Sequence, residues 1–224
     1  GTINPIAKIG ALARARGVLF HTDAVQAASQ MDLDVNALNV DMLAIGAHKF
    51  YGPKGVGALY VRAGTPLLAA QTGGSHERGL RAGTQNVPYI VGLAEALRIT
   101  AERRESDNRR FRGLRDRIIS GVLGQIPGAL LTGHPTERLP NHASFVFPGV
   151  DGNELLIHLD LAGIACSSGS ACKTGDPEPS GVLLAMGLPR DLALGSLRVT
   201  VGRRTTDEEV TQFLAVLPPL IDRR

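Results

Sequence analysis

Apolar residues recur at two spacings along this chain, one typical of helices and one typical of strands. Helical spacing predicts helices over residues 5–17, 25–38, 152–163, 180–188 and 206–223, and one or two long helices over 88–126. Short β-branched and apolar runs predict strands over residues 18–24, 40–48, 57–62, 129–133, 143–149 and 197–202. Strands that alternate with helices are typical of a layered α/β protein.

Polar and glycine-rich stretches divide these elements. Four glycines in residues 71–86 predict a loop of the kind that often meets an anion. Thr206 and Glu209, three residues apart, predict a capping box at the start of the last helix. A domain boundary is expected near residue 100, within the long helical stretch, giving domains of residues 1–100 and 101–224.

Composition narrows the class of protein. With 224 residues, 43% of them hydrophobic, the chain can bury one large or two modest cores. The formal charge is +3, and the basic stretch at 102–117 is interleaved with acidic residues, which favours a solvated helix face over a nucleic-acid site. Neither an apolar run of 18 residues nor a signal-like start is found, so we expect a cytoplasmic protein without a membrane segment.

The two cysteines, Cys166 and Cys172, lie in a run of small polar residues, "ACSSGSACKTG". In a reducing compartment they are expected to be unpaired, and five intervening residues is not a common zinc-ligand spacing. The sequence starts at Gly1 and enters helical spacing almost at once, from which we expect a fragment or a processed chain.

Two predicted strands end in reactive residues: His21, Asp23 and Gln26 in "HTDAVQ", and His48 and Lys49 in "GAHKFYGPKG". Ligands of open α/β sheets gather at such strand ends. A lysine in a tight loop after a buried strand is expected to be poorly solvated and able to form a Schiff base. Pyridoxal phosphate enzymes need this lysine and an acid beside the pyridine nitrogen. Considered alone, Lys49 is more simply a solvated lysine and Asp23 a helix-capping residue. Considered together with the adjacent His48, they favour cofactor chemistry.

Five motifs resemble, in order and at matching separations, those of the NifS/IscS-type cysteine desulfurases. They are "HTDAVQ", "GAHKFYGPKGVGALY", "GGSHERGLRAGT", "CSSGSAC" with "EPSGVLLAMGL", and "LRVTVGRRTTDEE". The resemblance extends over essentially the whole chain. It implies the aspartate aminotransferase fold (fold type I), with the C-terminal part of the large domain followed by the small α/β domain, and a homodimeric enzyme that converts L-cysteine to L-alanine and a protein persulfide.

The resemblance also implies roles for residues around pyridoxal 5'-phosphate. Lys49 would form the Schiff base with the cofactor, and Asp23 would pair with the pyridine nitrogen. Gln26 would bond the ring oxygen, and His48 would lie against the cofactor and help to bind its phosphate. Thr84 would reach the phosphate held by the partner subunit.

The same resemblance implies which residues bind the substrate and receive its sulfur. Arg198 would clamp the substrate carboxylate, a task that suits its planar fork. Cys172 would be the catalytic cysteine that receives the sulfur, and it could also serve as a transient iron–sulfur ligand; no resident metal is expected. Cys166, which follows the apolar "LAGIA", is expected to be a buried and inert thiol.

The chain departs from the family pattern in two respects. Gly46 stands where many relatives have a serine that bonds the cofactor phosphate, and the family's N-terminal part, with its phosphate-binding cup and ring-stacking histidine, is absent. The expected sulfur acceptor is an iron–sulfur scaffold, a tRNA-thiolation protein or another carrier. Two alternatives stay open: a selenocysteine lyase-like enzyme of the same fold, and a non-catalytic fragment that dimerises or docks acceptors.

Overall fold

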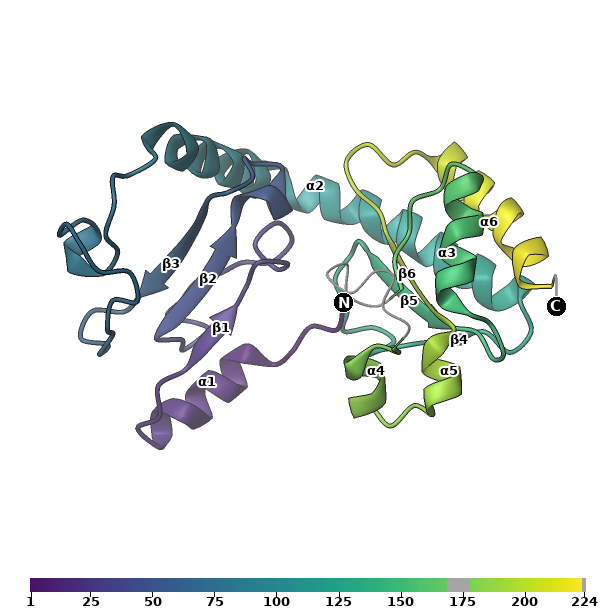
Figure 1. The fold of residues 1–224 in the computed structure, drawn as a ribbon, viewed down its shortest axis with the longest axis horizontal. Helices are drawn as coiled ribbons and strands as arrows, with labels where there is room; N and C mark the ends of the chain where they lie inside the picture. Colours follow the sequence, from purple (N-terminus) through teal and green to yellow (C-terminus); the bar gives the residue numbers. More distant parts are fainter. Residues whose placement is uncertain (169–177, 223–224) are drawn as a thin grey trace. The chain divides into compact units, whose positions relative to one another are not determined.

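The computed structural model describes residues 1–168 and 178–222. The chain forms two compact units. The N-terminal unit is Asn4–Glu105, and the C-terminal unit comprises Gly1–Ile3 and Ser106–Arg224. The units therefore divide within helix α2 (Val87–Gln125), five residues beyond the boundary expected at residue 100. Helix α2 is one continuous helix, the longest in Figure 1.

The N-terminal unit is built on a three-stranded sheet. Strand β1 lies parallel to β2, and β2 lies antiparallel to β3, in the order β1-β2-β3. Before α2, the elements of this unit are α1 (Ile6–Ala15), β1 (His21–Asp23), β2 (Met42–Gly46), η1 (Ala47–Phe50), β3 (Gly57–Val61) and η2 (Glu77–Gly79). The predicted strands are present, although β1 is shorter than the run of residues 18–24.

The helix predicted over residues 25–38 is wrong, because the structure has two turns there, at residues 25–30 and 35–39. Side chains of this stretch bond the main chain locally: Asp34 Oδ1 accepts from the N–H of Asn36 at 2.8 Å. Such local bonds compete with helical hydrogen bonding. Asn39 then adopts a φ of 57°, which a right-handed helix does not permit.

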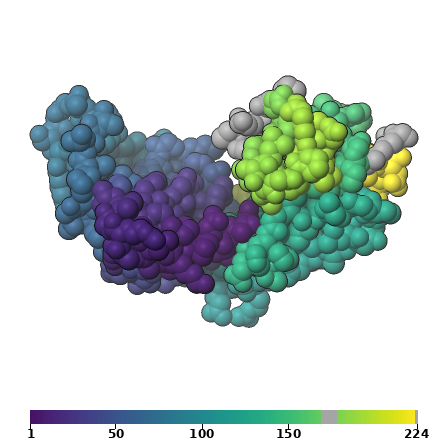
Figure 2. Space-filling view, turned by 90° about the horizontal axis from the view of Figure 1, so that it is seen from below, coloured from purple at the N-terminus to yellow at the C-terminus, as the bar shows by residue number. Residues whose placement is uncertain are grey.

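The C-terminal unit has an antiparallel sheet in the order β4-β5-β6. After α2 its elements are β4 (Leu130–Leu131), β5 (His142–Val146), α3 (Gly152–Leu161), α4 (Gly181–Ala185), α5 (Arg190–Leu194), β6 (Ser196–Thr200) and α6 (Asp207–Ile221). The capping box of Thr206 and Glu209 is confirmed at the start of α6. Helices α4 and α5, yellow-green in Figure 2, lie on the surface of this unit.

One face of the β4-β5-β6 sheet builds the main core. Phe145 on β5 and Leu197 on β6 are fully buried there, against α3, α6 and the second half of α2. Residues with the opposite orientation on the same strands, such as Ser144 and Arg198, are paired across β5 and β6 and lie on the other face of the sheet. Arg198 is therefore held on a strand whose alternate residues are fixed in the core.

The basic stretch at 102–117 is only partly the solvated face that its charge pattern predicts. Arg115 is 9% exposed and donates to the carbonyl of Leu139 at 3.1 Å. Arg110 and Arg117 contact the segment that leads into α6. Some of the charged side chains of α2 thus stabilise the C-terminal unit.

Candidate active site

The parallel pairing of β1 and β2 brings two of the predicted site segments to one edge of a sheet. Asp23, the last residue of β1, pairs with Ala44 of β2, and β2 ends two residues later at Gly46. Because both strands run in the same direction, the residues that follow them emerge at the same edge. The segment with Gln26 and the segment with Lys49 start from this edge.

Asp23 is exposed and has one carboxylate oxygen engaged locally. Its Oδ1 accepts from the N–H of Val25 at 2.8 Å, which fixes the side chain at the start of the turn. Within the described residues, no hydrogen bond to its Oδ2 is present. Gln26 is exposed on the same turn, three residues further on. Both side chains can therefore reach a ligand at this edge of the sheet.

Lys49 lies on the short helix η1 directly after β2. Ala47 and Phe50 are fully buried and anchor this turn, and the Phe50 carbonyl accepts from Thr100 Oγ1 at 3.4 Å. Between the two anchors, His48 and Lys49 point their side chains to solvent, and both are exposed. The expectation of a poorly solvated lysine is thus wrong for the described chain, because the Lys49 side chain is exposed while the core holds the short helix that carries it.

Tight backbone geometry ends this turn. Tyr51 adopts a φ of 67°, and Gly52 donates its N–H to the Ala47 carbonyl at 2.9 Å. A Cβ at Gly52 would lie 3.0 Å from the Ala47 carbonyl oxygen, so a larger residue would press on η1. The glycine keeps the turn that presents Lys49 compact.

Gly46 lies beside both segments of the edge. A Cβ at this position would lie 3.5 Å from Val25 Cγ1 and 3.8 Å from His48 Cε1, both ordinary contact distances. The backbone of Gly46 is extended, with φ −132° and ψ 122°. A serine would therefore fit without strain, and its hydroxyl would enter the space between the turn after Asp23 and the helix of Lys49.

The loop of residues 71–86 presents Thr84 on the surface. Ala82 is buried, and its N–H bonds the Gln71 carbonyl at 3.3 Å, which closes the loop on itself. Arg81 Nη1 donates to the carbonyls of Gly83 and Thr84 at 3.1 and 3.5 Å. The Thr84 side chain is left exposed by this arrangement.

In the C-terminal unit, Arg198 lies in the middle of β6. Its main chain pairs with Ser144 on β5 and forms a bridge to Ser167, with Arg198 N to Ser167 O at 2.6 Å. Ser167 is itself buried. The strand with Arg198 is thus bonded to the residue that directly follows Cys166.

Cys166 and Cys172 differ in what the structure shows of them. Cys166 packs against the main core of the C-terminal unit, and burial raises the pKa of its thiol to about 11, opposed in part by the charge of Arg198. A thiol with this pKa stays protonated at neutral pH and is a poor nucleophile. Cys172 lies outside the described residues, so its assignment stays a prediction.

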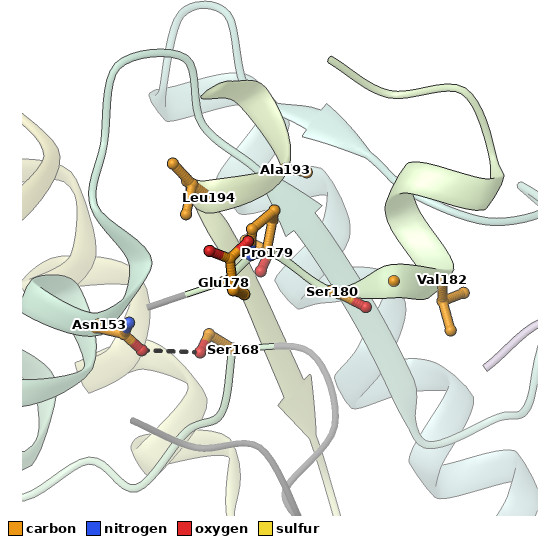
Figure 3. A pocket seen from close by; sticks show the side chains of 10 residues that line it. Asn153, Ser168, Glu178, Pro179, Ser180, Val182, Ala193 and Leu194 are labelled. Atoms are coloured by element: carbon orange, nitrogen blue, oxygen red, sulfur yellow. Dashed lines mark hydrogen bonds between the residues drawn. The ribbon is translucent and has the colours of Figure 1, made fainter. Parts of the chain in front are cut away.

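A pocket in the C-terminal unit was not predicted from the sequence. It has a volume of about 300 Å³ and opens between the start of α3, the α4–α5 hairpin and the start of β6 (Figure 3). Asn153 Oδ1 accepts from Ser168 Oγ at 3.3 Å, and Val182 and Leu194 are among the apolar residues that line the pocket. Nothing in the spacing of these residues along the chain indicates that they meet.

No group of three or more histidine, cysteine or acidic residues could hold a metal ion in the described ranges. No helix among the described elements is both long and apolar enough to cross a membrane.

The two units form part of the α/β fold of pyridoxal phosphate fold type I. The model of the "Aminotransferase class-V" family matches residues 1–213, and the chain belongs to this family, which uses pyridoxal phosphate. Within it, the chain is of the NifS/IscS type, as the five motifs predict.

The similar proteins agree with this placement. "Cysteine desulfurase IscS" of Clostridium botulinum (strain Hall) is 46% identical over all of this chain, which spans 57% of that protein. "Cysteine desulfurase IscS" of Methanosarcina thermophila is also 46% identical, and the chain spans 55% of it. A solved "NifS-like protein" superposes with a TM-score of 0.88 at 36% identity, covering 99% of this chain and 57% of that one. The chain thus spans little more than half the length of the relatives it matches.

Proposed function

We propose that the full-length protein containing this chain is a pyridoxal phosphate-dependent cysteine desulfurase that moves the sulfur of L-cysteine to Cys172 and releases L-alanine. The observation that supports this most is the shared sheet edge, where the parallel strands β1 and β2 end in Asp23 and Gly46 and lead to Gln26 and Lys49. The chain's identity of 46% to cysteine desulfurases over its whole length adds to it.

The residues at this edge suit the cofactor. Lys49 has an exposed amine on a fixed turn, which allows a covalent bond to a ligand aldehyde. Asp23 has an oxygen directed away from its local bond, available to an N–H donor. Gln26 and His48 supply hydrogen-bonding groups beside it, and Thr84 is our candidate for the phosphate of a partner subunit in a homodimer. When bound, pyridoxal phosphate supplies the electron sink that this chemistry needs.

The C-terminal unit supplies the groups that act on the substrate. The guanidinium of Arg198 binds the carboxylate of L-cysteine through two parallel hydrogen bonds. The thiolate of Cys172 attacks the substrate sulfur. A sulfur–sulfur bond forms as the carbon–sulfur bond breaks, the electron pair of the broken bond stays with the substrate carbon, and protonation of that carbon gives alanine. Cys172 is thereby oxidised to a persulfide.

Turnover of L-cysteine by the full-length protein tests this function. We expect alanine and, with a reductant, sulfide in equal amounts, and we expect Cys172→Ser to abolish both while keeping the visible absorbance of the bound cofactor. Cys166→Ser is the matched control and should retain turnover. Normal turnover by the Cys172→Ser variant would refute the assignment.

Substrate choice and the acceptor are further parts of the proposal. The rate with L-selenocysteine, measured beside that with L-cysteine, separates a desulfurase from a selenocysteine lyase-like enzyme. The persulfide then passes to an acceptor protein, which we propose is a scaffold for iron–sulfur assembly or a carrier for tRNA thiolation. Transfer of labelled sulfur from the loaded enzyme to each purified acceptor distinguishes the two.

A further inference from the structure

Strand β6 continues into a segment that is held mainly by a neighbouring helix. The last residue of β6 is Thr200, two residues beyond Arg198, and the next main-chain bond joins Val201 N to Asn141 O at 3.0 Å. Residues 202–205, here called the post-strand segment, belong to no strand in the described part of the chain. Two bonds close the segment on itself, from Gly202 N to Thr205 Oγ1 at 3.0 Å and from Thr205 N to Gly202 O at 3.2 Å.

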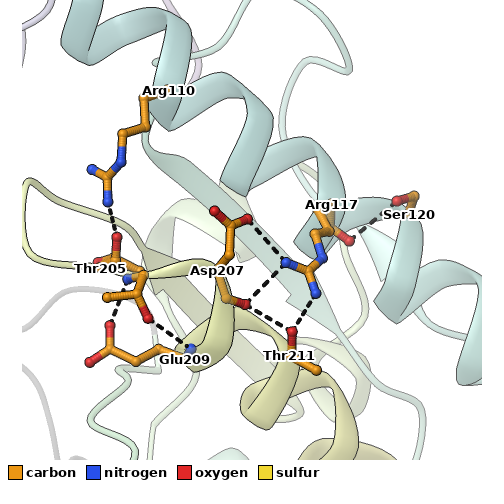
Figure 4. Close-up of polar contacts among 8 residues, drawn as sticks. Arg110, Arg117, Ser120, Thr205, Asp207, Glu209 and Thr211 are labelled. Atoms are coloured by element: carbon orange, nitrogen blue, oxygen red, sulfur yellow. Dashed lines mark hydrogen bonds and ion pairs between the residues drawn. The ribbon is translucent and has the colours of Figure 1, made fainter.

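Helix α2 holds the post-strand segment with two side chains. Arg110 Nη1 donates to the carbonyls of Gly202 and Arg203 at 3.3 and 3.4 Å. Its Nη2 donates to the carbonyl of Thr205, as Figure 4 shows. Asp107 Oδ2 accepts from Arg203 Nε at 2.7 Å. We call these contacts the α2 clamp.

The α2 clamp has the features of an interaction that fixes a backbone. Asp107 and Arg110 are three residues apart and so lie on the same face of α2. The side chains of Arg203 and Asp107 are only 20% and 14% exposed, which protects their ion pair from solvent screening. Arg110 bonds main-chain carbonyls with a charged donor, and such bonds are stronger than neutral ones. The clamp therefore restrains the position of the chain directly after β6.

We propose that Asp107 and Arg110 are positioning residues for Arg198, an inference that rests on the proposed function. Strand ends fray where the following chain is not held, and Arg198 is two residues from the last residue of β6. By fixing the post-strand segment, the clamp keeps the end of β6 paired with β5. The guanidinium of Arg198 then stays where it can bind the substrate carboxylate with both of its parallel donors.

Arg117 offers a matched control on the same helix. It lies seven residues beyond Arg110 and donates from Nη1 to the carbonyl and Oδ1 of Asp207 at 3.0 and 3.1 Å. It also contacts the hydroxyl of Thr211 (Figure 4). These contacts hold the start of α6 and not the post-strand segment. Removing Arg117 should destabilise the C-terminal unit without releasing β6.

The test compares Arg110→Gln and Arg117→Gln in the full-length protein. We expect Arg110→Gln to raise the KM for L-cysteine roughly fivefold to tenfold with kcat within about twofold. The reason is that the variant binds the substrate more weakly, whereas the steps after binding are unchanged. The inhibition constant of L-alanine, which has the same carboxylate, should rise in parallel. Both variants should keep the cofactor absorbance, and Arg117→Gln should keep the KM. If Arg110→Gln does not fold, Arg110→Lys and Asp107→Asn are measured in its place.

Two results would overturn this inference: an unchanged KM in Arg110→Gln, or an equal rise of KM in Arg117→Gln, which would mean a general loosening of the unit. Failure of the proposed function looks different, because the unchanged protein would then not turn over L-cysteine at all, and the positioning role would fall with it.

Discussion

At the scale of single residues, burial decides which ionisable groups of the C-terminal unit are reactive. Burial raises the pKa of Cys166 to about 11. Burial also lowers the pKa of His142 to about 3, helped by the positive charges of Arg198 and Arg138. At neutral pH the Cys166 thiol is therefore protonated and a poor nucleophile, and the His142 imidazole is a weak base.

Cys166 should resist alkylation in the folded protein. With a pKa of about 11, its thiolate fraction at pH 8 is on the order of 0.1%, against about a quarter for a free cysteine. Treatment with iodoacetamide at pH 8, followed by peptide mass spectrometry, should label Cys166 at least ~100-fold more slowly than in the urea-unfolded protein. Equal rates in the two states would show that the thiol is not buried.

His142 should make the folded protein sensitive to acid. Its pKa is lowered on folding from the ordinary 6.5 to about 3, so between these values the unfolded chain binds a proton that the folded chain does not. Stability is therefore retained above pH 6.5 and lost as the pH falls toward 3, by up to about 1.4 kcal/mol per pH unit.

Urea unfolding between pH 7 and pH 4 measures this effect of His142. The variant His142→Gln lacks the titrating group and should show a flatter dependence of the unfolding free energy on pH. The same slope in both proteins would mean that other groups cause the loss of stability in acid.

Gly46→Ser should tighten the binding of pyridoxal phosphate to the full-length protein. The added side chain meets only ordinary contacts, and its hydroxyl can bond the phosphate at a net gain of about 1 kcal/mol, which is roughly a fivefold lower Kd. Titration of the apoprotein by absorbance measures this. Gly46→Ala fills the same space without the hydroxyl, so equal Kd values for the two variants would contradict a phosphate at this position.

At the scale of secondary-structure elements, capping side chains determine where helix α6 starts. Thr206 Oγ1 accepts from Glu209 N at 3.2 Å, and Glu209 Oε2 accepts from Thr206 N at 2.9 Å, which satisfies two N–H groups at the start of α6. Helix α6 places Val210, Phe213, Leu217 and Ile221 in the core. The cap is therefore coupled to the packing of the whole C-terminal unit.

Thr206→Ala should lower the free energy of unfolding by about 1 kcal/mol, because the hydroxyl that accepts from Glu209 is lost. The midpoint of urea denaturation measures this, with Thr206→Ser as the control that keeps an acceptor. Equal stability of the alanine and serine variants would show that the box does not contribute.

The same elements show what sequence patterns can and cannot predict. The long helix, the capping box and the core strand with Phe145 follow from local spacing, and they are present. The helix over 25–38 was predicted from its apolar spacing, but Asp34 and Asn39 favour turns there. The spacing of apolar residues does not take account of polar side chains that form hydrogen bonds with the nearby backbone.

At the scale of the whole molecule, each unit carries its own group of residues that the proposed function uses. The N-terminal unit presents Asp23 and Lys49 at one sheet edge, a grouping that their positions at the ends of predicted strands indicated. The C-terminal unit holds Arg198 on β6 and contains the α2 clamp and the pocket beside Asn153. The clamp and the pocket could not be predicted, because they join residues that are distant along the chain and have no common motif.

The destination of the sulfur atom tests the central claim most directly. The full-length protein, mixed with one equivalent of L-cysteine and digested after alkylation, is examined by mass spectrometry of its cysteine peptides. The proposed function predicts one added sulfur on Cys172, none on Cys166, and one alanine formed per sulfur. Alanine formation with Cys172 unmodified, or with the added sulfur on Cys166, would contradict it.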